Sequence, residues 1–204
     1  MRILYLMLCL IFSVSVVNAK EVNLQRVQQI EDYLNTIKTI KASFVQTASN
    51  GNTAEGVLFV EKPNKIRMEY AEPTNVLIVG NGDYIVYNDK DLDQVTNIDY
   101  EDIPASLILA NNIKIDGKQV EVSNYYEDAG STVVTLRYPE KPEIMPITLT
   151  FTNSPFALRQ WSMVYPQSVE VIVSLYNNET DVALEEDLFK FKKAKSPMKY
   201  KGKK

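Results

Sequence analysis

Most of this chain alternates between apolar and polar residues with a period of two, and this pattern constrains the fold more than any other feature. Segment 147–152 shows it most clearly, because Ile147, Leu149 and Phe151 alternate with threonines. The alternation gives a strand one dry face and one wet face, as in an antiparallel sheet with a single core. The sequence predicts strands over 42–47, 55–61, 65–70, 76–79, 84–88, 119–125, 132–138, 147–152, 159–165 and 169–176.

Two segments depart from this alternation and predict helices. A helix over 22–39, with Asn23 as its N-cap, carries its apolar residues on one stripe at spacings of three and four. The stripe consists of Leu24, Val27, Ile30, Leu34 and Ile37. Residues 105–110 follow Pro104 without alternation and predict a short apolar helix. Together the segments predict a single domain after residue 19, a mainly β fold in which helices cover one face of a curled antiparallel sheet.

The first nineteen residues predict a cleaved export signal. A basic Met1-Arg2 start precedes an apolar run, and Val17-Asn18-Ala19 offers the small-residue pattern of a cleavage site. A membrane anchor is the alternative, but the run is shorter than the ~20 apolar residues that cross a bilayer. The only cysteine, Cys9, lies within this segment. We therefore expect an exported mature domain, residues 20–204, without thiols.

Composition excludes several classes of enzyme. The chain has no histidine, which removes the commonest general base, the commonest transition-metal ligand and every Ser-His-Asp arrangement. Without a mature cysteine, thiolate nucleophiles and cysteine metal sites are excluded as well. A hydrolase that uses two carboxylates is the enzyme reading left open. The acidic clusters at 101–102, 127–128 and 185–187 have polar, turn-like surroundings, so we expect a binding protein without metal or cofactor.

Charge is distributed unevenly along the chain. Eight lysines fall within the last fifteen residues, and the segment from about 192 to 204 forms a basic tail. Without Arg2, thirteen basic residues face 26 acidic ones in the mature body before these lysines. Such a tail can dock on anionic lipid, fold back on the acidic body or remain solvated. The acidic body and the export signal argue against nucleic acid as a partner.

An ordered set of segments resembles the LolA family, the periplasmic carriers that move lipoproteins to the outer membrane. The segments are 40–46, 55–70 with Pro73, 81–82, 85–87 and 92–95. Pro104 followed by Leu107-Ile108-Leu109 looks like the short lid helix of that family, and 187–191 looks like its terminal strand. The resemblance covers essentially the whole mature chain.

The resemblance implies a fold and a set of partners. The fold is an unclosed antiparallel β-barrel whose concave apolar face is covered by helices, and the covered cavity takes up acyl chains. The implied protein is a monomeric periplasmic chaperone that moves lipoproteins from the inner to the outer membrane. Its partners would be acylated lipoproteins and an inner-membrane lipoprotein-releasing transporter, with an outer-membrane acceptor left open. A lipid- or lipoprotein-sensing regulatory module of the same fold is the alternative.

The resemblance also assigns roles to residues. Lys62 stands where the family has a basic residue, usually Arg, that hydrogen-bonds the lid and controls its opening. Ile66 stands where the family has an apolar residue that receives cargo from the transporter. Packing in an ordinary core is the alternative for each residue that we expect to line the acyl-chain cavity. These are Phe59, Met68, Tyr70, Leu107, Ile108, Leu149, Phe151, Trp161, Met163, Val171 and Val173.

Overall fold

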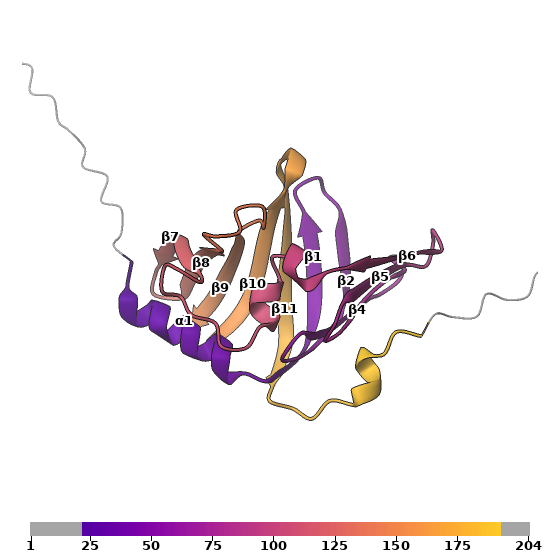
Figure 1. The fold of residues 1–204 in the computed structure, drawn as a ribbon, viewed down its shortest axis with the longest axis horizontal. Coiled ribbons are helices and arrows are strands. Elements are labelled where there is room, and N and C mark those ends of the chain that lie inside the picture. The colour runs from indigo at the N-terminus through magenta and orange to yellow at the C-terminus, as the bar shows by residue number, and fades with distance from the viewer. Residues whose placement is uncertain (1–21, 193–204) are drawn as a thin grey trace, which may run out of the picture.

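A computed structural model describes residues 22–192. The predicted signal peptide with Cys9 and the tail from residue 193 onward lie outside the described residues. Within them, eleven antiparallel strands form a single sheet with the order β6-β5-β4-β3-β2-β1-β11-β10-β9-β8-β7 (Figure 1). The strands are β1 (Thr39–Ala48), β2 (Thr53–Glu61), β3 (Lys65–Tyr70), β4 (Val76–Asn81), β5 (Ile85–Asp89), β6 (Gln94–Ile98), β7 (Glu121–Glu127), β8 (Ser131–Arg137), β9 (Ile147–Asn153), β10 (Phe156–Tyr165) and β11 (Val169–Thr180).

The sheet curls without closing, which confirms the predicted fold class. Its two halves are joined where β1 pairs with β11, and β6 and β7 remain as separate edges. Cross-strand pairing places Leu58 opposite Met68 and Val60 opposite Ile66, so these buried residues share the concave face. Residues with the other parity, such as Arg67, therefore lie on the convex face.

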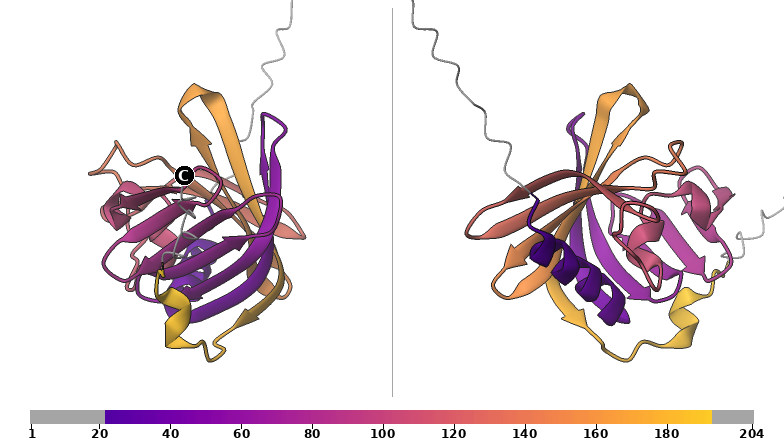
Figure 2. Two further views of the ribbon diagram at one scale, coloured as in Figure 1. Left: turned by 90° about the vertical axis from the view of Figure 1, so that its right-hand side faces the viewer. Right: turned by 60° about the vertical axis from the view of Figure 1, so that its left-hand side comes forward.

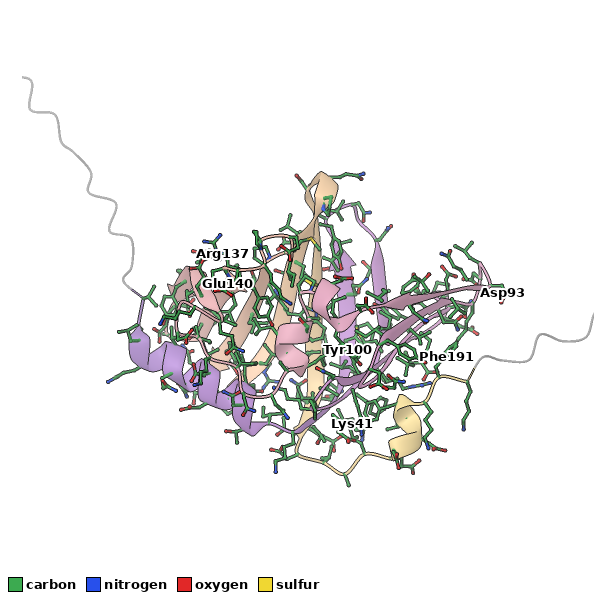
Figure 3. The ribbon with its side chains drawn as sticks, in the orientation of Figure 1. Lys41, Asp93, Tyr100, Arg137, Glu140 and Phe191 are labelled. Carbon is green, nitrogen blue, oxygen red and sulfur yellow. The ribbon has the colours of Figure 1, made fainter. Side chains whose placement is uncertain are left out.

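Helix α1 (Leu24–Thr36) covers the β8–β10 half of the concave face (Figure 2). Its Tyr33 ring meets Phe151 and Phe156 edge-on, with ring centroids 5.5 and 5.6 Å apart. The Asn23 side chain accepts a hydrogen bond from the backbone N–H of Arg26, which confirms the predicted cap. The predicted stripe is too long: Leu24 is 79% exposed, and the chain is already extended at Ile37.

The structure corrects three further predictions. The short helix α2 (Ser106–Leu109) is shorter than predicted, and β6, which the sequence analysis missed, forms one edge of the sheet. The expected terminal strand at 187–191 is wrong, because Glu186–Phe189 forms a 3-10 helix, η3. The Phe189 side chain in η3 is only 2% exposed, so hydrophobic burial anchors this end without strand pairing.

The C-terminal segment packs on the convex face. An Arg67 guanidinium N–H donates to the Leu188 carbonyl at 3.2 Å, and the Lys65 ammonium lies 5.8 Å from the centre of the Phe189 ring. Since Arg67 and Lys65 both belong to β3, the segment covers the side of this strand opposite Met68 (Figure 2). The C-terminal segment therefore does not cover the concave side of β3.

Candidate functional site: an apolar cavity under the α2 loop

An apolar cavity of about 410 Å³ lies on the concave face, between the first strands and β10–β11. Its volume falls within the ~300–1,000 Å³ usual for ligand pockets. The segment 102–105, just before α2, closes one side. The strands of the two sheet halves supply most of the other lining residues: Gln46, Ile66, Met68, Tyr70, Ile78, Ile85, Tyr87, Ile98, Trp161, Met163, Tyr165, Val171 and Val173.

The structure brings seven of the sequence-predicted residues together in this wall. They come from strands that are far apart in the sequence and meet because the sheet curls. The seven are Ile66, Met68, Tyr70, Trp161, Met163, Val171 and Val173.

The remaining candidates lie elsewhere. Phe59 sits opposite Arg67 and Lys41, and this register turns it to the convex face, so its placement in the cavity wall is corrected. Leu107, Ile108, Leu149 and Phe151 are at most 4% exposed within the packed core, and none of them lies in the cavity wall. These four residues are ordinary core residues.

Several lining residues were not foreseen from the sequence. Ile78 lies opposite Met68 and Tyr87, while Ile85 lies opposite Ile98. They could have been predicted only if the pairing of β3 with β4 and of β4 with β5 had been known, because that pairing places them on the same face as Met68. Met145, in the loop before β9, carried no sequence signal and reaches the wall only through the tertiary fold.

Tyrosine hydroxyl groups supply polar atoms in the cavity wall. The Tyr70 hydroxyl donates to the Gln46 side-chain carbonyl at 2.8 Å. Burial raises the pKa of Tyr70 and the pKa of Tyr165 above the ordinary tyrosine value, because the phenolate is poorly solvated there. Both hydroxyl groups therefore stay neutral near neutral pH and can act as hydrogen-bond donors.

The turn between β2 and β3 ties the helices to the sheet. The Lys62 ammonium donates to the Leu34 carbonyl in the last turn of α1, one of the terminal carbonyls that a helix leaves unpaired. This corrects the expected partner of Lys62, which contacts α1 and not the short helix α2. The contact with α2 comes from the same turn, because the Asn64 backbone N–H donates to the Leu109 carbonyl at 3.1 Å.

Tyr100 completes this junction. Its hydroxyl donates to the Asn64 carbonyl and accepts from the Gly82 N–H at 3.3 Å. Gly80 makes room for the ring, since a Cβ atom there would lie 2.2 Å from the Tyr100 hydroxyl. The Asn35 side chain of α1 adds two 2.8 Å hydrogen bonds to the backbone of Ile113. The loop that follows α2 is thereby bound to α1.

The other end of α1 is fixed by charge. The Arg26 guanidinium pairs with the Glu127 carboxylate of β7 at 2.8 Å, and Tyr125 donates to the same carboxylate at 2.5 Å. The hydrogen bond from Tyr125, followed by those from Arg26 and Asn23, holds the pKa of Glu127 below its usual value. Helix α1 is therefore attached to the sheet at both ends.

Burial lowers the pKa of Lys62 from 10.5 to about 8, because the ammonium group loses solvation. Between pH 8 and 10.5 the folded protein therefore binds fewer protons at this site than the unfolded chain does. The contribution of this group to the free energy of unfolding therefore rises with pH across this window. We expect unfolding of the wild type to cost about 2 kcal/mol more at pH 9.5 than at pH 7 from this group alone.

Denaturant unfolding at these two pH values measures the gain, with Lys62→Met as the reference. The variant lacks the titrating group and should lose this part of the pH dependence. An NMR titration of the Lys62 side chain should give a midpoint near 8. A midpoint near the ordinary lysine value of about 10.4 would contradict the buried environment of the amine.

Within 22–192, no group of three or more acidic, histidine or cysteine side chains is placed to hold a metal ion. Over the same range, neither α1 nor α2 has the length and apolar character that a membrane-crossing helix requires.

A protein-family comparison matches residues 35–192 to the model described as "Outer membrane lipoprotein carrier protein LolA". The match begins at the end of α1 and ends with the C-terminal segment, so it includes every strand and the whole cavity wall.

The individual relatives include one protein that carries the same description. A protein of Rickettsia prowazekii described as uncharacterized is 26% identical over 89% of this chain and 83% of its own. An outer-membrane lipoprotein carrier protein of Chromobacterium violaceum is 34% identical over 51% of each chain. The chain thus matches about half of that carrier's length. The crystal structure of a DUF1329 family protein from Desulfovibrio piger superposes with a TM-score of 0.51 at 9% identity, covering 81% of this chain and 95% of that one. That likeness concerns the fold alone.

Proposed function

The chain belongs to the LolA family, and on that premise we propose that it is a periplasmic carrier which shields the acyl chains of lipoproteins in the cavity. It would move them from the inner to the outer membrane. The observation that carries the proposal is the cavity itself, with a largely apolar wall assembled from both halves of an unclosed sheet.

The physical demand on such a carrier is large. One sixteen-carbon acyl chain carries about 12 kcal/mol of hydrophobic free energy, at ~0.8 kcal/mol per methylene, so an acylated protein cannot cross water unshielded. Ile66, Met68 and Val173 offer apolar surface to such a chain. The Tyr165 hydroxyl in the same wall is suited to donate to the ester and amide carbonyls that join acyl chains to a protein, whereas the Tyr70 hydroxyl already donates to Gln46.

Release requires that the cover over the cavity can open. Segment 102–105 covers the cavity, and α2 behind it is tied to the β2–β3 turn through Asn64. We assign Lys62 as the latch that holds α1 to the same turn. Ile66, which lines the cavity beside that turn, is the candidate for receiving cargo from an inner-membrane transporter. An outer-membrane acceptor would take the cargo from the carrier.

Native mass spectrometry of the protein purified from the periplasm tests this proposal. We expect adducts with the masses of acylated proteins or acyl chains, which detergent removes. A clean unliganded mass together with measurable hydrolysis of an acylated substrate would contradict the carrier role. It would favour the carboxylate hydrolase instead.

A further inference from the structure

The two edges of the sheet are protected to different extents. Edge strands usually carry charges, bulges or a cover that prevents further pairing. At β7, Glu127 pairs with Arg26 of α1 and Glu121 pairs with Arg137. The pairing of β7 with β8 also contains a bulge between Val122 and Asn124. This edge is therefore charged, irregular and partly covered.

The β6 edge has none of these devices. Its sequence from Gln94 to Ile98 contains no charged residue and no proline, and its register with β5 runs without a shift. Four of the five residues are exposed. Within residues 22–192, no strand pairs with the outer side of β6 (Figure 1), so the backbone N–H and C=O groups on that side have no strand partner.

This open edge continues the wall of the cavity. Ile98 lines the cavity, and its partner Ile85 lines it from β5. Thr96 pairs with Tyr87, another lining residue. A strand added outside β6 would extend the concave wall by one strand and would lie beside the cavity. The edge and the cavity are two parts of one surface.

We propose that the β6 edge binds the polypeptide segment that adjoins the acylated residue of a cargo protein, by adding that segment to the sheet as a further strand. The inference rests on the proposed carrier function. Because Ile98 places β6 in the cavity wall, an acylated residue held at that side of the cavity would have its polypeptide beside this edge. Strand addition uses backbone hydrogen bonds, and it therefore accepts cargo of many sequences.

Synthetic lipopeptides with the same acyl chains and different peptide lengths test the proposal. One carries a single residue, and the other carries a ten-residue uncharged extension. We expect the longer lipopeptide to bind about tenfold more tightly, because the net gain of one or two hydrogen bonds corresponds to about that factor. Hydrogen exchange should slow at alternate amides of 94–98 with the longer ligand only. The amides of β7, at the other edge of the sheet, are the control and should exchange at an unchanged rate.

Two N-methylated versions of the longer lipopeptide test whether the extension binds as a strand. One is methylated at the odd-numbered amides of the extension and the other at the even-numbered amides. An added strand directs alternate amides toward its neighbour, so one version should lose the tenfold gain and the other should keep it. Equal loss in both, or no gain from the extension, overturns the edge inference alone. Failure of every lipopeptide to bind overturns the carrier function as well.

A second copy of the chain is the competing occupant of this edge. Sedimentation at the concentration used for hydrogen exchange distinguishes the two cases. We expect a monomer without ligand, with fast exchange in β6. A dimer whose β6 amides are already protected would overturn the assignment of this edge to cargo.

Discussion

Met163→Glu is expected to reduce the affinity for a lipopeptide at least about 100-fold, which corresponds to roughly 2.7 kcal/mol. The Met163 side chain is 9% exposed and lines the cavity. A carboxylate there would contact the acyl chain in a site with few solvating groups, and burying an unpaired charge is costly. Binding isotherms with a fluorescent lipopeptide measure the loss.

The neighbouring residue supplies the matched control. Val164 follows on the same strand but is 57% exposed on the opposite face, since successive strand residues alternate between faces. Val164→Glu should keep the affinity within about twofold of wild type. Thermal unfolding of both variants separates loss of binding from loss of folding, and the smaller change Met163→Gln serves if Met163→Glu does not fold. Wild-type affinity in a folded Met163→Glu protein would rule out the cavity as the acyl-chain site.

Lys62→Leu is expected to leave the protein folded and to make cargo accumulate on it. The substitution removes the hydrogen bond to the Leu34 carbonyl, together with a charge that burial disfavours. The net change in stability is therefore small, while α1 loses its connection to the β2–β3 turn. We expect the transfer of bound lipopeptide to acceptor vesicles to slow about tenfold, because the lost hydrogen bond no longer favours the empty, closed protein over the loaded one.

Lys65→Leu is the control from the same turn. The Lys65 ammonium pairs with the Glu61 carboxylate at 2.7 Å and lies over the Phe189 ring on the convex side, so these interactions do not involve α1. Its transfer rate should equal that of the wild type. If Lys62→Leu transfers cargo at the wild-type rate, or if it lowers the melting temperature by more than about 5 °C, the latch assignment fails.

Local sequence pattern was sufficient for most of the secondary structure. Strand β9 was predicted at nearly its full length, because its apolar residues alternate strictly with threonines. Strand β6 was missed because its sequence shows no alternation of apolar and polar residues. A short edge strand buries little side-chain surface, so it does not need an apolar face. The terminal segment was misassigned as a strand, because Phe189 is buried against the convex face from a 3-10 helix.

The candidate site depended on pairing between distant segments. Residues 56–60 are apolar almost throughout, so alternation could not show whether Leu58 or Phe59 faces inward. The register with β3 decided this, by placing Leu58 opposite Met68 and Phe59 opposite Arg67. Likewise the partner of Lys62 lies 28 residues away in the chain, beyond any local pattern.

By itself, the sequence determined that the chain forms a mainly antiparallel sheet with helices on one face, and that it lacks histidine chemistry. Those properties follow from residue types and short-range periodicity, which are local. Only the tertiary structure decided where the concave face is filled by α1 and where it stays open as a cavity. An unfilled space arises where side chains from several strands fail to meet, and no single segment carries that information.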